Sequence, residues 1–111
     1  TNDKKQQINM ILEVAILSVK KGLETKFETD FKKASRYISA IDGYLNHKLK
    51  KCLEQSNKYI LLVEWRNLED HTIGFKQSEN YQHWRKLLNH YYDPHPTVEH
   101  YETVFEMHQN N

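Results

Sequence analysis

The feature that most constrains the fold is an apolar run near the start of the chain, MILEVAILSV, at residues 10–19. Both of its alternating sets of side chains are apolar, and only Glu13 and Ser18 interrupt them. Successive side chains of a strand point to opposite faces, so this run predicts a strand that is covered on both faces. A buried helix has a similar apolar content, but the β-branched residues and the KKG that follows favour the strand.

An amphipathic helix is predicted next, over residues 22–40. Its apolar residues recur at spacings of three and four, as on a helix with one buried face: Phe27, Phe31, Ala34, Ile38 and Ile41. The pair Asp42-Gly43 ends this helix. Two extended stretches follow, at residues 44–55 and 59–65. Because only residues 56–58 separate them, they are expected to form an antiparallel hairpin.

Two further helices and a last strand complete the pattern. Asn67 is expected to cap a short helix, and Ser78 a second helix that runs to about Tyr92. Asp93-Pro94 ends it, because the residue before a proline is disfavoured in the helical region. The buried stripe of this helix is predicted to consist of Tyr81, Trp84, Leu87, Leu88 and Tyr91. From Thr97 to Met107 the residues alternate again, which predicts a strand.

The predicted order is β-α-β-β-α-β, an α+β ferredoxin-like fold with a four-stranded antiparallel sheet and its helices on one face. One domain is expected at residues 10–106, between a disordered arm at 1–9 and a tail at 107–111. The other sheet face would expose part of the first strand: Leu12, Val14 and Ile16. An apolar face of that size predicts a homodimer in which two sheets pack together and the last strand reaches across to the other subunit.

The composition excludes several classes of function. A formal charge of +1 gives no reason to expect nucleic acid or an anionic membrane as a partner. No apolar run is long enough to span a membrane, and the polar start has no apolar signal core. The single Cys52 cannot form an internal disulfide, so a cytoplasmic location is expected. No phosphate-binding loop, dinucleotide fingerprint or serine nucleophile motif occurs.

The segment from Trp65 to Tyr101 concentrates rings that carry a polar tip. It holds both tryptophans, five of the seven histidines and four of the seven tyrosines. Such rings suit a pocket that holds a flat organic molecule and moves protons on it. The functional site is therefore expected to involve this segment.

Glu13 and His71 are the expected catalytic residues. Glu13 interrupts an apolar strand, where a carboxylate is costly unless it is paired or hydrated, and it has the same facing as Ala15, toward the helices. His71 begins a helix, and an imidazole suits a general base that Glu13 could orient. The structural alternatives for Glu13 are a buried ion pair with an Arg or Lys, or a hydrogen bond to His71 or His100. The alternative for His71 is a hydrogen bond to a nearby backbone carbonyl or carboxylate.

Four more side chains are expected to bind the substrate: Trp84, Tyr81, Tyr91 and His100. The three aromatic residues share a helix stripe, so core packing is the alternative for them. Trp65 is expected to pack in the core. The histidines at 90, 95 and 100 lie on different elements, and no spacing typical of a metal site occurs. No metal is therefore expected.

Several segments together resemble the antibiotic biosynthesis monooxygenase family over residues 10–105: VAILSVKKGLETKFETDF, the Asp42-Gly43-Tyr44 turn, YILLVEWRNLEDHTIGF and SENYQHWRKLLNHYYDPHPTVEHYE. This resemblance implies a dimeric α/β barrel. It also implies a place among cofactor-independent oxygenases of aromatic phenols, quinol oxygenases and haem-degrading enzymes. The working Asn, Trp and His of the haem-degrading branch fall on or near Ala15, Gly74 and Trp84, so haem degradation is not expected.

The sequence is compatible with two functions. The first is a monooxygenase that needs no cofactor and oxidises a small aromatic phenol or quinol with O2. The second is a non-catalytic homodimer that binds a small aromatic ligand. An open cavity lined by histidine would favour the first, and a cavity filled by Tyr81, Trp84 and Leu87 would favour the second.

Overall fold

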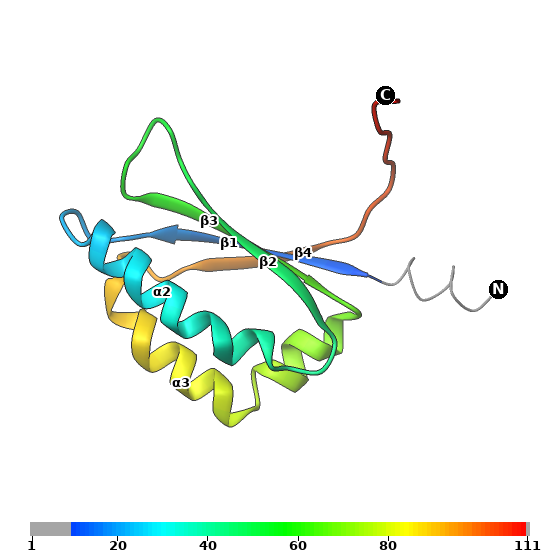
Figure 1. Cartoon of the computed structure of the whole chain (residues 1–111), viewed down its shortest axis with the longest axis horizontal. Helices are drawn as coiled ribbons and strands as arrows, with labels where there is room; N and C mark the ends of the chain where they lie inside the picture. Colours follow the sequence, from blue (N-terminus) through cyan, green and yellow to red (C-terminus); the bar gives the residue numbers. More distant parts are fainter. Residues whose placement is uncertain (1–9, 111) are drawn as a thin grey trace.

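The computed structural model describes residues 10–110 (Figure 1). The arm expected at residues 1–9 and the final Asn111 of the expected tail lie outside the described residues. In chain order the elements are β1 (Ile11–Ser18), α2 (Glu24–Ser39), β2 (Tyr44–Lys51), β3 (Lys58–Trp65), the π-helix η1 (Asp70–Phe75), α3 (Glu79–Leu88), the 3-10 turn η2 (Asn89–Tyr91) and β4 (Thr97–Tyr101).

The four strands form one antiparallel sheet in the order β2-β3-β1-β4. Figure 1 shows α2 and α3 side by side on one face of this sheet. The predicted α+β ferredoxin-like fold is therefore confirmed. The two central strands, β3 and β1, are the two most apolar runs of the chain.

The core lies between the sheet and the helices. Alternate residues of β3 are buried on the helix side: Tyr59, Leu61, Val63 and Trp65. They meet the predicted stripe of α2, of which Phe27, Phe31, Ala34 and Ile38 are buried. Burial of one large apolar side chain contributes about 1.5–3 kcal/mol, so these two rows hold α2 against the sheet.

Two strands end earlier than the sequence predicts. We expected the last strand to reach Met107, but β4 ends at Tyr101. Tyr101 pairs with Leu12 near the start of β1, so the residues after Tyr101 have no neighbouring strand within the described chain. The second strand was expected to reach Gln55 but ends at Lys51, because its pairing with β3 stops at Tyr59 and the residues between form a loop.

The sheet face away from the helices is apolar, as predicted. Leu12 and Val14 are half-buried there, and Ile16 is 37% exposed. The register of β1 with β3 adds Ile60 and Leu62 to the same face. The segment after β4 is also apolar and exposed, through Val104, Phe105 and Met107. Figure 1 shows this segment leading away from the sheet.

Candidate active site

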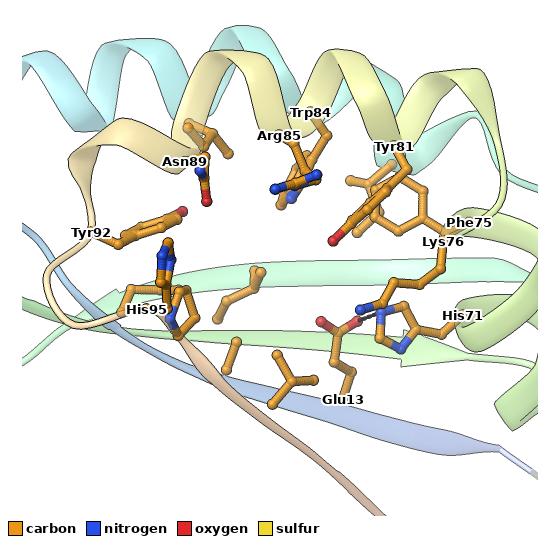
Figure 2. Close-up of a pocket in the computed structure, with 17 residues that line it drawn as sticks. Glu13, His71, Phe75, Lys76, Tyr81, Trp84, Arg85, Asn89, Tyr92 and His95 are labelled. Carbon is orange, nitrogen blue, oxygen red and sulfur yellow. Dashed lines mark ion pairs between the residues drawn. The ribbon is translucent and has the colours of Figure 1, made fainter.

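A cavity of about 400 Å³ lies between the helix-covered face of the sheet and α3 (Figure 2). Glu13, Ala15 and Leu61 lie on its sheet side, and Trp84 and Arg85 on its α3 side. Small-molecule sites typically enclose about 300–1,000 Å³, so this cavity is large enough for a small aromatic ligand. The cavity stays open because Tyr81 and Trp84 stand along its wall and are only half-buried.

Glu13 supplies the acidic group of the cavity. The alternation of β1 turns its side chain toward the helices beside Ala15, as predicted, and leaves it only 5% exposed. The indole Nε1 of Trp65 donates a hydrogen bond of 2.9 Å to its Oε1. Burial raises the pKa of Glu13 to about 7, although the Trp65 hydrogen bond and the positive charge of Lys76 oppose the rise.

His71 is held over Glu13 by the short helix η1. Asn67 begins this segment as predicted, because its Oδ1 accepts a hydrogen bond from the backbone N–H of Asp70. Asp70 packs closely against Gly43, whose φ of +90° and whose missing Cβ both favour glycine there. The resulting ring position stacks His71 on Trp65, with centroids 5.4 Å apart.

The ring nitrogens of His71 contact two different elements of the sheet. Nε2 lies 3.3 Å from the Glu13 Oε1, and Nδ1 lies 2.8 Å from the His100 Nε2. The pKa of His71 is lowered to about 4, mainly by burial and in addition by the neighbouring His100 and Lys76. Burial also lowers the pKa of His100, with Lys76 as a second cause. Both imidazoles are therefore neutral at pH 7, and each carries one N–H proton.

These pKa shifts favour a different division of roles from the one expected from the sequence. We expected His71 to be the base and Glu13 to orient it. A base works best when its pKa is close to the operating pH, and the carboxyl of Glu13, rather than the imidazole of His71, meets that condition. His71 is better placed to fix the carboxyl and to exchange a proton with it.

His100 stands behind His71 instead of on the cavity wall, contrary to its expected contact with the substrate. It pairs with Glu13 in the register of β1 and β4, so both side chains lie on the helix-covered face. The residues that line the cavity include His71 but not His100. Glu13, His71 and His100 therefore form one chain of contacts from the cavity to β4.

The expected aromatic residues divide between the cavity and the core. Tyr81 and Trp84 line the cavity, but Tyr91 does not. The Tyr91 ring is buried against Phe27 at a centroid distance of 5.6 Å, and its hydroxyl donates a 2.6 Å hydrogen bond to Asp30. The helix tightens into the 3-10 turn η2 before this residue, so the spacing of an α-helix no longer applies there. Tyr92 faces the cavity instead.

Five polar side chains of the cavity were missed in the sequence: Lys76, Arg85, Asn89, Tyr92 and His95. A signal for two of them was present. Tyr81, Arg85 and Asn89 follow one another at intervals of four, and that spacing places them on one face of a helix beside the apolar stripe. Lys76 could not be found this way, because the wider turn of η1 changes the facing of the residues after it.

Residues 10–110 contain neither a candidate metal site nor a candidate membrane-spanning helix. No group of three or more His, Cys, Asp or Glu side chains is placed to hold a metal ion within this part of the chain. None of its helices combines the length and the apolar character needed to cross a membrane.

Comparison with known proteins places this site in context. The sequence model of the antibiotic biosynthesis monooxygenase family matches residues 10–87. The uncharacterized protein YczJ of Bacillus subtilis (strain 168) is 52% identical over 95 residues, which are 86% of this chain and all of that protein.

Two solved structures have the same fold. One is a Bordetella bronchiseptica protein, provisionally assigned as an antibiotic biosynthesis monooxygenase, at a TM-score of 0.84 and 31% identity over 87% of this chain and 99% of that one. The other is SnoaB, a cofactor-independent oxygenase from Streptomyces nogalater, at a TM-score of 0.71 and 16% identity over 93% of this chain and 99% of that one. At that identity the likeness to SnoaB concerns the fold alone.

Proposed function

Because the chain belongs to the antibiotic biosynthesis monooxygenase family, we propose that it is a monooxygenase that oxidises a small aromatic phenol or quinol with O2, without a cofactor. The observation that carries the proposal is a buried carboxyl with a pKa of about 7 on one wall of an open, aromatic-lined cavity. SnoaB, which has the same fold, is a cofactor-independent oxygenase, and this supports a reaction of the same type.

Glu13 acts as the general base in this proposal. Its ionised carboxylate removes a proton from an acidic C–H or O–H of the bound aromatic ring system. The resulting carbanion or phenolate transfers electrons to O2 and forms a C–O bond to a peroxide anion. This anion takes a proton from solvent and becomes a hydroperoxide. Loss of water from the hydroperoxide leaves a carbonyl group, so one oxygen atom enters the product and the other leaves as water. The substrate supplies all of the electrons.

His71 and His100 then carry the proton away from Glu13. Protonated Glu13 can pass its proton to the His71 Nε2 across the 3.3 Å contact, once a small ring rotation shortens it. His71 can release its Nδ1 proton to the His100 Nε2, 2.8 Å away. Because both rings are neutral at pH 7, each has one nitrogen free to accept. His100, which is partly exposed, then gives its other ring proton to solvent, and this leaves the carboxyl ionised. Both rings must return to their starting tautomers before the next turnover.

Tyr81 and Trp84 hold the flat substrate on the α3 side of the cavity. Figure 2 shows the Tyr81 hydroxyl and the Trp84 ring extending from α3 toward the cavity, with Glu13 on the opposite side. An aromatic wall binds the substrate by stacking and excludes water from the reactive intermediate. Because neither ring fills the cavity, the arrangement supports catalysis over a purely structural use of the space.

Oxygen uptake with anthrones and quinols under air tests the proposal. Glu13→Gln removes the base but keeps the shape of the side chain, and we expect a loss of about 10²–10⁴ in rate, the usual contribution of general acid–base catalysis. Glu54→Gln is the matched control, because Glu54 is exposed in the loop between β2 and β3 and does not line the cavity.

The pH dependence of the same assay separates the two candidate bases. If Glu13 is the base, kcat/KM rises as the pH passes through about 7 and reaches a plateau above it. If His71 were the base, its pKa of about 4 would place that rise far lower. Binding of an anthrone or quinol without oxygen uptake by the wild type would refute the oxygenase and leave a ligand-binding protein.

We also propose that the chain is a homodimer in the cytoplasm, with the apolar face around Ile16 as the interface. Two observations support the dimer: within residues 10–110 no helix covers this sheet face, and the segment after β4, whose Phe105 and Met107 are exposed, leads away from the sheet. In a dimer, the segment after β4 would cover part of the partner's sheet. Light scattering that gives a monomer at micromolar concentration would contradict this arrangement, and fluorescence microscopy of a tagged chain tests the location.

A further inference from the structure

Six polar side chains face the cavity without a partner. Within residues 10–110, no side-chain hydrogen bond or ion pair is made by Lys76, Tyr81, Arg85, Asn89, Tyr92 or His95, except that the Lys76 ammonium lies over the Tyr81 ring at 5.4 Å. Four of the six are exposed and the two tyrosines are half-buried, so water solvates them in the free protein. A ligand in the cavity can take the place of that water. The cavity is therefore equipped for a ligand with polar groups at defined places.

The charged members of this set are both cations. Lys76 follows η1 and Arg85 lies on α3, and among residues 10–110 Glu13 is the only acidic residue that lines the cavity. Figure 2 shows the ammonium of Lys76 near the Glu13 end and the guanidinium of Arg85 over the middle of the cavity. The charge of Lys76 acts on Glu13, whereas Arg85 makes no ion pair within residues 10–110. The two cations outnumber the single carboxylate, so the cavity wall keeps a positive charge that favours an anionic ligand.

We propose that the substrate is an aromatic carboxylate, whose carboxylate binds between Lys76 and Arg85 while its ring lies against Trp84. The planar fork of Arg85 can bind both carboxylate oxygens, and Lys76 adds a second charge. This inference rests on the proposed oxygenase function, because it names the class of substrate that the same site takes.

The other end of the cavity indicates a second polar group on the same ligand. Figure 2 shows Asn89, Tyr92 and His95 gathered at the end away from His71. The Asn89 amide, the Tyr92 hydroxyl and the His95 imidazole offer hydrogen-bond donors and acceptors, which suit a phenol hydroxyl or a ring carbonyl. The ligand is therefore an elongated aromatic molecule with an acid group near one end and a neutral oxygen at the other.

Calorimetric titration with a matched ligand pair tests the proposal without any turnover. The probes are 6-hydroxy-2-naphthoate and its uncharged amide, 6-hydroxy-2-naphthamide, in a buffer of low ionic strength because salt screens partly exposed charges. We expect the carboxylate to bind the wild-type protein at least about tenfold more tightly than the amide, as expected for charge-assisted hydrogen bonds.

Three variants and one control show which side chains cause the preference for the carboxylate. Arg85→Met and Lys76→Met are each expected to remove most of the preference for the carboxylate, and Arg85→Lys to restore part of it. Lys86→Met is the control, since it removes the same charge from the next position of α3, and Lys86 does not line the cavity. This variant should keep the full preference.

Three outcomes would overturn the inference: equal or tighter binding of the amide, binding of neither ligand, or the same loss in Lys86→Met as in Arg85→Met. A wrong substrate class can be distinguished from a wrong reaction type. Oxygen uptake with neutral quinols alone would refute only the anionic substrate class. Carboxylate binding that depends on Arg85 but gives no oxygen uptake would refute only the oxygenase.

Discussion

Replacing Glu13 by Gln tests whether the buried carboxyl destabilises the fold when it is ionised. Burial raises the pKa of Glu13 from 4.5 to about 7. The neutral carboxyl of Glu13 therefore contributes to the stability of the fold. This contribution is fully present below pH 4.5, the pKa in the unfolded chain, and it is lost as the pH rises through about 7, the pKa in the folded chain. A tenfold change in an ionisation constant corresponds to about 1.4 kcal/mol, so the whole effect on the free energy of unfolding is about 3 kcal/mol.

The pH dependence of wild-type stability does not reveal the contribution of Glu13 by itself, because the contribution of His71 changes with pH in the opposite direction. The pKa of His71 is lowered from 6.5 to about 4, so its contribution is present above 6.5 and is lost as the pH falls through about 4. Between about pH 4.5 and 6.5 the two contributions change in opposite directions and largely cancel. A comparison of Glu13→Gln with the wild type removes every shared contribution and isolates the carboxyl.

The assay is urea unfolding followed by circular dichroism, at one fixed protein concentration because a dimer's stability depends on concentration. We expect Glu13→Gln to match the wild type near pH 4.5 and to exceed its free energy of unfolding by about 3 kcal/mol near pH 8. The amide oxygen of the variant can still accept the Trp65 hydrogen bond. Glu54→Gln should show no such pH dependence.

The opposite sign would refute the reasoning. If the wild type gains stability relative to Glu13→Gln as the pH rises from about 4.5 to 6.5, then the ionised carboxylate is stabilised by a protonated His71. Glu13 and His71 would then form a true ion pair at neutral pH. In that case Glu13 could not be the general base proposed above.

Three further predictions concern neighbouring side chains. Trp65→Phe removes the hydrogen bond that lowers the pKa of Glu13, so the rise of kcat/KM with pH should move to higher pH; an unchanged profile would contradict that contact. Tyr91→Phe should reduce the free energy of unfolding by about 1 kcal/mol and leave ligand affinity unchanged, while Tyr92→Phe should weaken ligand binding in calorimetry; the reverse pattern would contradict their placement. Ile16→Glu should give monomers in light scattering, and a persistent dimer would exclude this sheet face as the interface.

Much of the fold could be predicted from local patterns. The apolar runs of β1 and β3 and the stripe of α2 each identify their element, because strand and helix periods are properties of the backbone. The alternation of β1 also placed Glu13 on the helix side, since neighbouring Ala15 had to be buried. The ends of β2 and β4 could not be predicted, because a strand ends where its partner does, and the register decides that.

The sequence by itself thus determined the order of the elements, their buried faces and the residue types available to the site. The tertiary structure alone decided which of them act together. Glu13, His71 and His100 come from three separate elements, and only the pairing of β1 with β4 under η1 brings them into contact. Their pKa values follow from that shared burial, because desolvation depends on the surroundings of a group and not on its identity. For this reason the structure, and not the sequence, identified Glu13 as the candidate base.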